Sequence, residues 1–510
     1  MDFLLLFFLI IEFIIDFWVY FSSHTHIFQL NYYKPKQQFT WIKKNIKTIG
    51  TSCTIYIGIF LLLLLGENIG KICAIIIYLI HIYMYLPKEA KIPLVYTNRV
   101  LRLIGTAYLI IGCTMLGVKR IELLPIFGLI VPGLLLVIDL INKPINLYIN
   151  KQYINQAKKT IKNMPNLIVI GVTGSYGKTS VKNFLGKLLS TKYNVLITPE
   201  NYNTTLGVTK TIREKLRPIH QIFICEMGAT KTGDIKEICD LVEPQHGIIT
   251  SIGPQHLESF LNIENVIKTK FELSNSLPKD GMVFLNYDNT YIKEHKIEKE
   301  TISYGAENKN VDYLAYNICT NQKGLTFKMK DAEKNEYTFE TKILGQHNIT
   351  NIAGCIAIAN KLGIPMNKLV AKVKSLEGVE HRLQLRESGK DLIIDDAYNS
   401  NPNGAKSALD TLNLFSGVKI VITPGMIELG EKQYECNNTF GKQIAEIADY
   451  IILVGEKQTK PIYEGIASKN FNKENIIIVE DVKKAITIAN NLQTEERKII
   501  LLENDLPDNY

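Results

Sequence analysis

The chain has 510 residues, 46% of them hydrophobic, and a formal net charge of +8. At roughly 150 residues per domain, this length fits about three domains. Many basic residues lie beside apolar segments in the first third, so membrane-flanking charge explains the excess and we expect no nucleic-acid partner. The eight cysteines include no C-x-x-C pair, which is typical of reduced thiols rather than of a zinc or disulfide framework.

Residues 1–150 are predicted to form a membrane domain, because they contain apolar segments long enough to cross a bilayer. We place five spans, or four if the acidic first segment lies at the interface. The first is no simple signal peptide, since it lacks a basic start and carries Glu12 and Asp16. Carboxylates within membrane segments can be functional, but these two acids and Asp139 lie near segment ends, where interfacial positions are expected. The segments are 3–20, 50–66, 70–87, 101–118 and 123–142.

The distribution of lysine and arginine predicts the orientation of these spans. Basic residues gather in the loops at 21–49 and 87–102 and after residue 142, whereas the alternate loops carry only Lys71, or Lys119 with Arg120. The positive-inside rule therefore predicts a multi-pass protein of the cell membrane whose residues 143–510 lie in the cytoplasm.

A glycine-rich turn at 171–180 follows the apolar run Leu167–Ile170 and precedes a helix-compatible stretch at 178–189. Such a turn directs backbone N–H groups at an anion, and the helix N-terminus adds its positive dipole end. A lysine there reaches nucleotide phosphates, and the next hydroxyl can hold Mg²⁺. The usual P-loop glycine is replaced by Val172. The predicted nucleotide-binding residues are Gly174, Ser175, Tyr176, Gly177, Lys178, Thr179 and Ser180.

Apolar runs alternate with helical patterns after residue 165, which predicts a mostly parallel sheet. The expected strands are 167–172, 193–198, 221–226, 247–251 and 282–286, followed by a strand-like stretch at about 301–345. A second alternation starts near residue 391 and includes 418–423, 450–454, 475–479 and 498–502. The fold class is thus an α-helical membrane domain (1–150) followed by two α/β domains (151–380 and 381–510).

Four further clusters contain residue types that act in catalytic sites, but each cluster alone is only weak evidence for a function. Glu226 ends a predicted strand, where a carboxylate can coordinate Mg²⁺, and His256 follows the next strand. Lys268, Lys270 and Glu272 share a predicted helix that begins near Asn262, where a solvated charged face is the simpler explanation. The polar run Asp395–Pro402 is equally compatible with a capped turn.

Together these residues resemble the Mur ligase family from about residue 165 to the C-terminus, and most closely its members that add D-alanyl-D-alanine. The shifted glycine pattern of the turn is that family's own form. The matching motifs are Thr173-Gly-Ser-Tyr-Gly-Lys-Thr179, Asn201-Tyr-Asn-Thr-Thr-Leu-Gly207, Glu226-Met-Gly-Ala229, His256-Leu-Glu-Ser-Phe260, Lys268-Thr-Lys270, His347-Asn348, His381-Arg382, Asp395-Asp-Ala-Tyr-Asn399 and Glu428-Leu-Gly430.

The resemblance implies a P-loop central domain, a Rossmann-like C-terminal domain and a role for each matching residue. The catalytic residues would be Lys178, Lys270 and His256, with Lys270 modified by CO₂ to a carbamate. ATP would be bound by the turn and by Asn348, Arg382 and Asp396, and Mg²⁺ by Thr179, Glu226 and His256. The residues expected to contact substrate are Asn203, Thr204, Tyr398 and Asn399.

The implied reaction transfers a phosphoryl group from ATP to a carboxylate, and an amine then attacks the acyl phosphate to give an amide. Two departures from the family bear on the substrate. Membrane spans replace the domain that grips the UDP-sugar, and Thr423-Pro-Gly-Met426 stands where the D-alanyl-D-alanine-adding members read Gly-Asp-Met. We therefore predict a small-molecule or lipid-linked cell-envelope precursor as donor, and an amino acid or dipeptide as acceptor.

Three other functions stay open. A poly-γ-glutamate or folate polyglutamate ligase shares the ATPase core, although the Tyr-Asn-Thr and Asp-Asp-Ala-Tyr-Asn details favour the peptidoglycan side. A membrane-coupled transport or signalling ATPase would turn over ATP without an amine acceptor. An inactive scaffold would be expected to have lost Lys178 or Glu226, and both are present.

Overall fold

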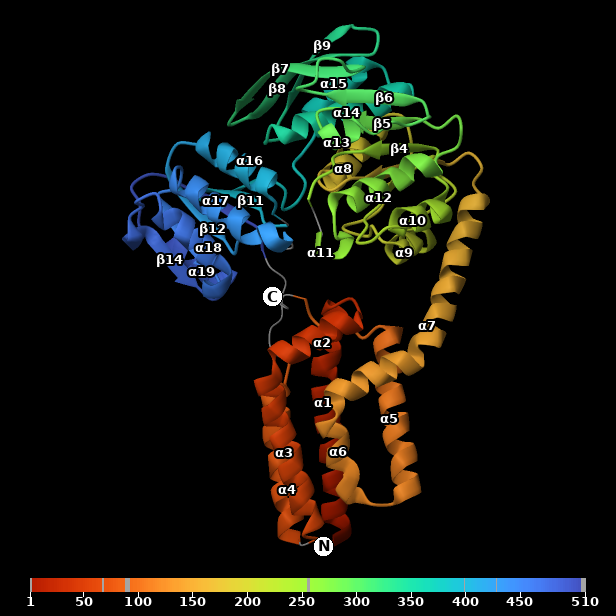
Figure 1. Cartoon of the computed structure of the whole chain (residues 1–510), viewed down its shortest axis with the longest axis vertical. Coiled ribbons are helices and arrows are strands. Elements are labelled where there is room, and N and C mark those ends of the chain that lie inside the picture. The colour runs from red at the N-terminus through yellow and green to blue at the C-terminus, as the bar shows by residue number, and fades with distance from the viewer. Residues whose placement is uncertain are drawn as a thin grey trace. The chain divides into compact units, whose positions relative to one another are not determined.

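The computed structural model describes residues 2–66, 68–87, 92–254, 257–398, 400–427 and 429–505. The chain forms two compact units, a helical unit at Met1–Lys151 and a second unit at Gln152–Asp505 (Figure 1). Each unit has hydrophobic cores of its own and is described by itself.

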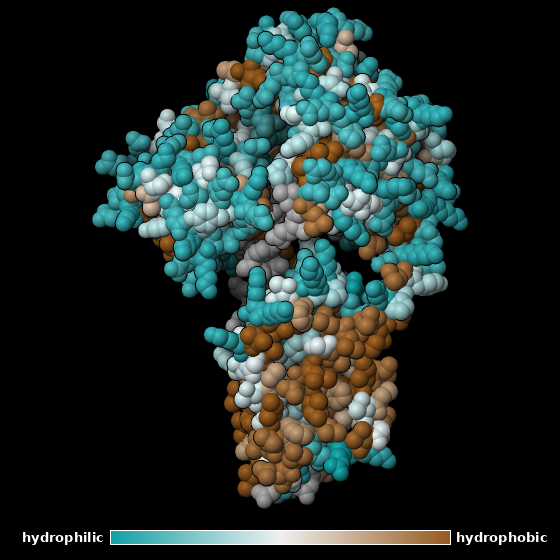
Figure 2. All heavy atoms as spheres, viewed as in Figure 1, coloured by the Kyte–Doolittle hydropathy of each residue, from teal (hydrophilic) through white to brown (hydrophobic). Residues whose placement is uncertain are grey.

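Among the described residues, the helical unit contains five helices that are long and apolar enough to cross a membrane, judged by length and composition. Hydrophobic side chains cover most of its visible face in Figure 2. Its elements are α1 (Asp2–Leu30), α2 (Pro35–Lys44), α3 (Ile46–Leu64), α4 (Asn68–Tyr85), α5 (Asn98–Val118), a 3₁₀ turn (Ile121–Leu123), α6 (Leu124–Leu129) and α7 (Val131–Lys162).

The first predicted segment is too short, because α1 continues past residue 20 to Leu30. Asp16 therefore lies in the middle of its helix and not near an end, and its side chain is fully buried. Tyr56 on α3 and His81 on α4 each contact one of its carboxylate oxygens at 2.6 Å. The last segment is divided, since a short α6 precedes a long α7 that extends far beyond residue 142.

A nine-stranded sheet forms the centre of the next domain, in the order β2-β3-β1-β4-β5-β6-β7-β8-β9. Its strands are parallel from β2 to β7, and β8 and β9 are added antiparallel. The strands are β1 (Ile168–Thr173), β2 (Val195–Ile197), β3 (Ile222–Glu226), β4 (His246–Ile249), β5 (Val283–Asn286), β6 (Thr301–Gly305), β7 (Tyr313–Asn321), β8 (Gly324–Lys330) and β9 (Glu336–Thr341).

Helices cover both faces of this sheet and bury its apolar side chains (Figure 1). One face packs against α8 (Lys178–Leu189), α14 (His347–Lys361) and α15 (Met366–Lys374). The other packs against α9 (Thr205–Lys215), α10 (Asp234–Val242) and α12 (Ile263–Ser276). Two short helices, α11 (Leu257–Phe260) and α13 (Thr290–Lys293), lie in connections.

The C-terminal domain has a six-stranded sheet in the order β10-β11-β15-β12-β13-β14, parallel except for β10. Its strands are β10 (Gln384–Ser388), β11 (Asp391–Asp396), β12 (Val418–Thr423), β13 (Tyr450–Val454), β14 (Ile476–Val479) and β15 (Lys498–Glu503). Its helices are α16 (Pro402–Asn413), α17 (Gln433–Ala445), α18 (Glu456–Ala467) and α19 (Val482–Asn491), with short 3₁₀ turns at Gly430–Lys432 and Lys473–Asn475. The predicted strands all form, and β10 is an additional one.

Candidate active site

The glycine-rich turn joins β1 to α8, and two of its residues need backbone conformations that favour glycine. Gly174 has φ +151° and Gly177 has φ +81°. A Cβ atom would lie 2.1 Å from Thr250 Oγ1 at Gly174 and 2.7 Å from Asn351 Oδ1 at Gly177. Any larger side chain would therefore push the turn away from its neighbours.

The loop after β4 holds this turn in place. Ser175 N donates to Ser251 O at 2.7 Å, and Tyr176 N donates to Ser251 Oγ at 3.1 Å. The Ser175 hydroxyl donates to Gly253 O at 3.1 Å. These bonds fix the entrance of α8, whose buried Ser180 follows in its first turn.

Lys178 folds back over its own turn, where Nζ donates to Gly174 O at 2.7 Å and Ser175 O at 3.0 Å. The pKa of Lys178 is lowered to about 8, mainly by burial; Glu226 opposes this shift, and the positive charge of Arg382 adds to it. A phosphate group would supply the counter-charge that this amine lacks.

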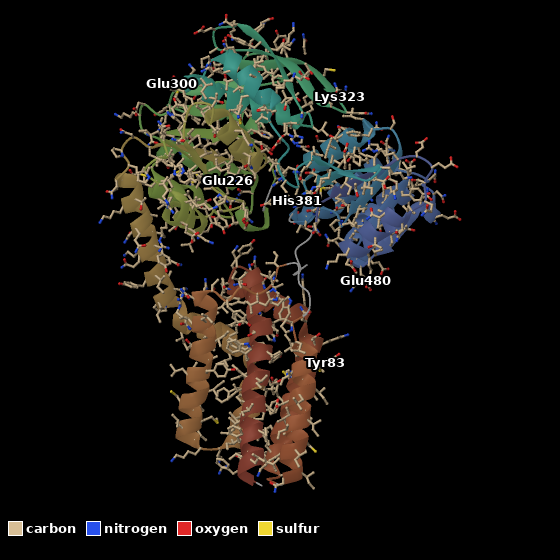
Figure 3. The ribbon with its side chains drawn as sticks, turned by 180° about the vertical axis from the view of Figure 1, so that it is seen from behind. Tyr83, Glu226, Glu300, Lys323, His381 and Glu480 are labelled. Atoms are coloured by element: carbon tan, nitrogen blue, oxygen red, sulfur yellow. The ribbon has the colours of Figure 1, made fainter. Side chains whose placement is uncertain are left out.

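Glu226, labelled in Figure 3, lies at the carboxyl end of β3 and contacts side chains from α8 and from the loop before α9. Its Oε1 accepts hydrogen bonds from Thr179 Oγ1 at 3.2 Å and Asn203 Nδ2 at 3.0 Å. Lys182 Nζ lies 3.0 Å from Oε2 as an ion pair, without the geometry of a hydrogen bond. Oε2 is thus a buried acceptor with no hydrogen-bond donor.

This oxygen and the Thr179 hydroxyl fit Mg²⁺, which prefers carboxylate and hydroxyl ligands beside substrate phosphates. In that position the ion would neutralise charge on the transferring phosphoryl group. The third expected ligand, His256, lies outside the described residues. Among those that are described, no three His, Cys, Asp or Glu side chains gather as a metal site.

The topology explains why these groups meet. In the sheet β1 lies between β3 and β4, so the turn after β1 is flanked by the ends of two strands reached by crossovers in different directions. Ligands of open α/β sheets bind at such a switch point.

Lys270 lies on α12, as predicted, and its side chain is buried. Burial lowers the pKa of its amine well below the ordinary value, and the charge of Lys178 adds to the effect. Asp234 and Glu272 oppose the shift. A neutral amine is the form that reacts with CO₂.

The remaining predicted residues of this domain are found in local structural roles. The Thr204 hydroxyl caps α9 by accepting from Gly207 N at 3.3 Å. Asn348 is buried, and its Nδ2 donates to Leu344 O at 2.8 Å. Its Oδ1 accepts from Asn351, the residue beside Gly177, so α14 is connected to the turn.

The predicted residues of the C-terminal domain lie around Arg382. Its guanidinium carbon lies 4.2 Å from the ring centroid of Tyr398, and its charge acts on the buried Asp396. Burial raises the pKa of Asp396 to about 6. Asn399 is outside the described residues, and so is Glu428. Figure 3 labels the neighbouring His381, which contacts Asp395 at 2.9 Å.

Sequence reasoning missed two charged residues of this region. Lys182 lies four residues after Lys178, on the same face of α8, and this spacing could have revealed it. Glu503 is fully buried and pairs in register with Asp396 across β15 and β11. No local pattern connects two residues so distant in sequence.

Residues 172–359 match the Mur ligase middle domain, and residues 381–503 match the Mur ligase glutamate ligase domain, which together exceed half of the chain. The chain belongs to the Mur ligase family. It is an ATP-dependent, ADP-forming amide ligase of the kind its relatives represent.

Two relatives and one solved structure illustrate this similarity. The UDP-N-acetylmuramoyl-tripeptide–D-alanyl-D-alanine ligase of Haemophilus influenzae is 26% identical over 356 residues, covering 68% of this chain and 76% of its own length. The Bacillus subtilis ligase of the same name is 30% identical over 312 residues, covering 60% and 66%. The crystal structure of MurF from Acinetobacter baumannii aligns with a TM-score of 0.63 at 25% identity, over 70% of this chain and 77% of that one.

Proposed function

We propose that this Mur ligase joins a D-alanyl-D-alanine-like amine to the carboxylate of a muramoyl-peptide precursor. The proposal rests on the proximity of Lys178, Thr179 and Glu226 at the switch point. These residues place a phosphate-binding amine and Mg²⁺-binding oxygens in one site. The relatives named for this reaction support the choice of substrates. The proposed domains remain 1–150, 151–380 and 381–510.

In the proposed site Lys178 binds the phosphates, Thr179 and Glu226 hold Mg²⁺ with His256, and Asn348, Arg382 and Asp396 close over the nucleotide. Asn203, Thr204, Tyr398 and Asn399 contact the substrates. Preorganised charge of this kind supplies most of the catalysis of phosphoryl transfer.

We also propose that Lys270 carries a carbamate. Its neutral Nζ would attack the carbon of CO₂, form an N–C bond and release one proton, which turns a buried amine into an anion. The lowered pKa of Lys270 supports this step. The test is a ¹³C carbamate resonance in protein equilibrated with ¹³C-bicarbonate; its persistence in Lys270→Arg would contradict the assignment.

The helical unit is proposed to span the cell membrane five times, with the ligase domains in the cytoplasm and a lipid-linked donor at the membrane. Its five apolar helices and the basic loops on one side support this placement. Retention of the chain in membranes after an alkaline carbonate wash tests it, and release into the supernatant would contradict it.

The substrate test compares ADP release by the full chain in detergent with two donors, the soluble UDP-tripeptide and a lipid-linked muramoyl peptide, each with and without D-alanyl-D-alanine. We expect amine-dependent turnover that is faster with the lipid-linked donor. Lys178→Ala should abolish it. Equal rates would remove the lipid-linked part of the proposal, and turnover without an amine would favour a transport ATPase.

A further inference from the structure

A polar seam lies between two apolar helices of the helical unit. It consists of Arg99 and Arg102 on α5 and of Asp139, Asn142 and Asn146 on α7, which we call the α5–α7 seam. Arg99 Nη2 donates to Asp139 Oδ1 at 3.0 Å, and Arg102 Nη2 donates to Asn146 Oδ1 at 2.7 Å. The helical spacing of three and four residues places each set on one face.

The α5–α7 seam has more hydrogen-bond donors than acceptors. Within the described residues, Arg99 Nε, Arg102 Nε and Asn146 Nδ2 are buried without a hydrogen-bond partner, although the Arg99 guanidinium lies over the Tyr33 ring, and none of the seam's acceptor atoms is in that state. Asn146 is only 8% exposed. The two arginines face one carboxylate, so the seam also has a positive charge left over. Buried donors without acceptors are costly, and they indicate a missing acceptor.

The position of the seam along α5 favours an anion over water. Arg99 and Arg102 lie in the first two turns of α5, at the end of the basic region 87–102, whereas the rest of α5 up to Val118 carries no charged residue. A charged group at the end of an apolar helix lies at the depth of lipid headgroups. A phosphate there offers several acceptor oxygens and negative charge to the three donors that lack a hydrogen-bond partner.

We propose that the α5–α7 seam binds the phosphate group of a membrane lipid. The inference rests on the membrane placement in the proposed function and extends it, since the phosphate of a lipid-linked donor would hold that substrate near the ligase. An ordinary anionic phospholipid offers the same chemistry, and the experiment separates the two sources.

The test measures binding of farnesyl diphosphate to the full chain in an uncharged detergent, without ATP or amine. We expect Arg102→Gln to raise Kd at least tenfold and Asn146→Leu to raise it severalfold. Arg120→Gln is the matched control, because it removes the same charge from an exposed position of the same unit and should leave Kd unchanged. Arg102 is preferred to Arg99, whose loss would leave Asp139 unpaired.

Competition identifies the source of the phosphate. Displacement of the probe by phosphatidylglycerol micelles, but not by phosphatidylcholine, would assign the seam to anionic phospholipids; resistance to both would favour a diphosphate-linked lipid. Absence of binding, or equal Kd values for the wild type, Arg102→Gln and Asn146→Leu, would overturn the proposal. If Arg102→Gln fails to fold, the Kd values of Asn146→Leu and Arg102→Lys for farnesyl diphosphate test the proposal in its place. Because no turnover is measured, a negative result leaves the ligase assignment standing.

Discussion

Lys182 and Glu226 form an ion pair in which each side chain is only 2% exposed. Lys182 Nζ also donates to Glu200 O at 2.6 Å, so the lysine is anchored from two sides. Lys182 is therefore the side chain that balances the charge of the Glu226 carboxylate when Mg²⁺ is absent. Removing one partner of such a pair leaves a buried charge without compensation.

We therefore predict that Lys182→Met lowers the free energy of unfolding by about 3–5 kcal/mol in Mg²⁺-free buffer. Adding Mg²⁺ with ADP should restore part of the loss, because the ion supplies the missing positive charge. The double variant Lys182→Met/Glu226→Gln should be more stable than the single one. Thermal unfolding measures all three, and a single variant that is insensitive to Mg²⁺ with ADP would contradict the idea.

The lowered pKa of Lys178 predicts the pH dependence of nucleotide binding. The amine binds phosphate when protonated, and its pKa in the free protein is about 8. Affinity should therefore be full below pH 8 and fall above it, by about tenfold for each further pH unit. Titration with a non-hydrolysable ATP analogue from pH 7 to 9.5 measures this. In Lys178→Met the affinity should be weak and independent of pH over this range.

At the scale of secondary-structure elements, β11 and β15 place two carboxyl groups side by side. Asp396 and Glu503 are paired in register, and burial raises the pKa of both, Asp396 to about 6 and Glu503 well above its usual range. Because the folded protein holds protons that the unfolded chain releases, this pair stabilises the fold at pH 4 and loses that contribution as the pH rises through 6.

Glu503→Gln should flatten this pH dependence, since an amide cannot ionise and still reaches the Ser400 hydroxyl, which lies 2.5 Å from Glu503 Oε1. At pH 4 the free energies of unfolding of the two proteins should be similar. At pH 7 that of the variant should be higher than that of the wild type by on the order of 2 kcal/mol. Thermal midpoints across pH 4–7 measure the difference. Parallel curves for the two proteins would show that the pair does not titrate in this range.

In the helical unit a buried hydrogen-bond chain ties three helices together. Asp16 on α1 contacts Tyr56 on α3 and His81 on α4, and His81 Nε2 lies 3.2 Å from the Ser52 hydroxyl. Asp16→Leu would leave the Tyr56 hydroxyl and a His81 nitrogen without an acceptor. We expect Asp16→Leu to lower the free energy of unfolding by about 2–5 kcal/mol. Asp16→Asn should lower it less, because the amide keeps one acceptor oxygen. Unfolding in detergent tests the order, and equal effects would contradict it.

At the scale of the whole molecule, local sequence signals predicted the glycine-rich turn and the strand that ends at Glu226, whereas features that depend on residues distant in sequence were missed. The glycines at 174 and 177 and the strand-end Glu226 are visible because a turn and a strand end have local signatures. The Asp396–Glu503 pair depends on sheet order, and the Asp16 chain depends on how three helices are rotated. The length of α1 was underestimated because the polar residues after Tyr20 do not break a helix.

The cores of the molecule predict what each unit can do alone. All buried clusters of the ligase domains are built from Ala157 onward, whereas that of the helical unit uses residues from Leu9 to Ile138. A fragment beginning at Gln152 should therefore fold, and Mg²⁺ with ADP should raise its thermal midpoint. We expect it to keep amine-dependent turnover of a soluble UDP-tripeptide. If the proposed membrane placement holds, it should lose at least tenfold in kcat/KM for a lipid-linked donor, because the helical unit would no longer concentrate that donor. An equal loss with both donors would show instead that the helical unit supports the active site itself. A fragment that does not respond to ADP would mean that the ligase domains need the helical unit to fold.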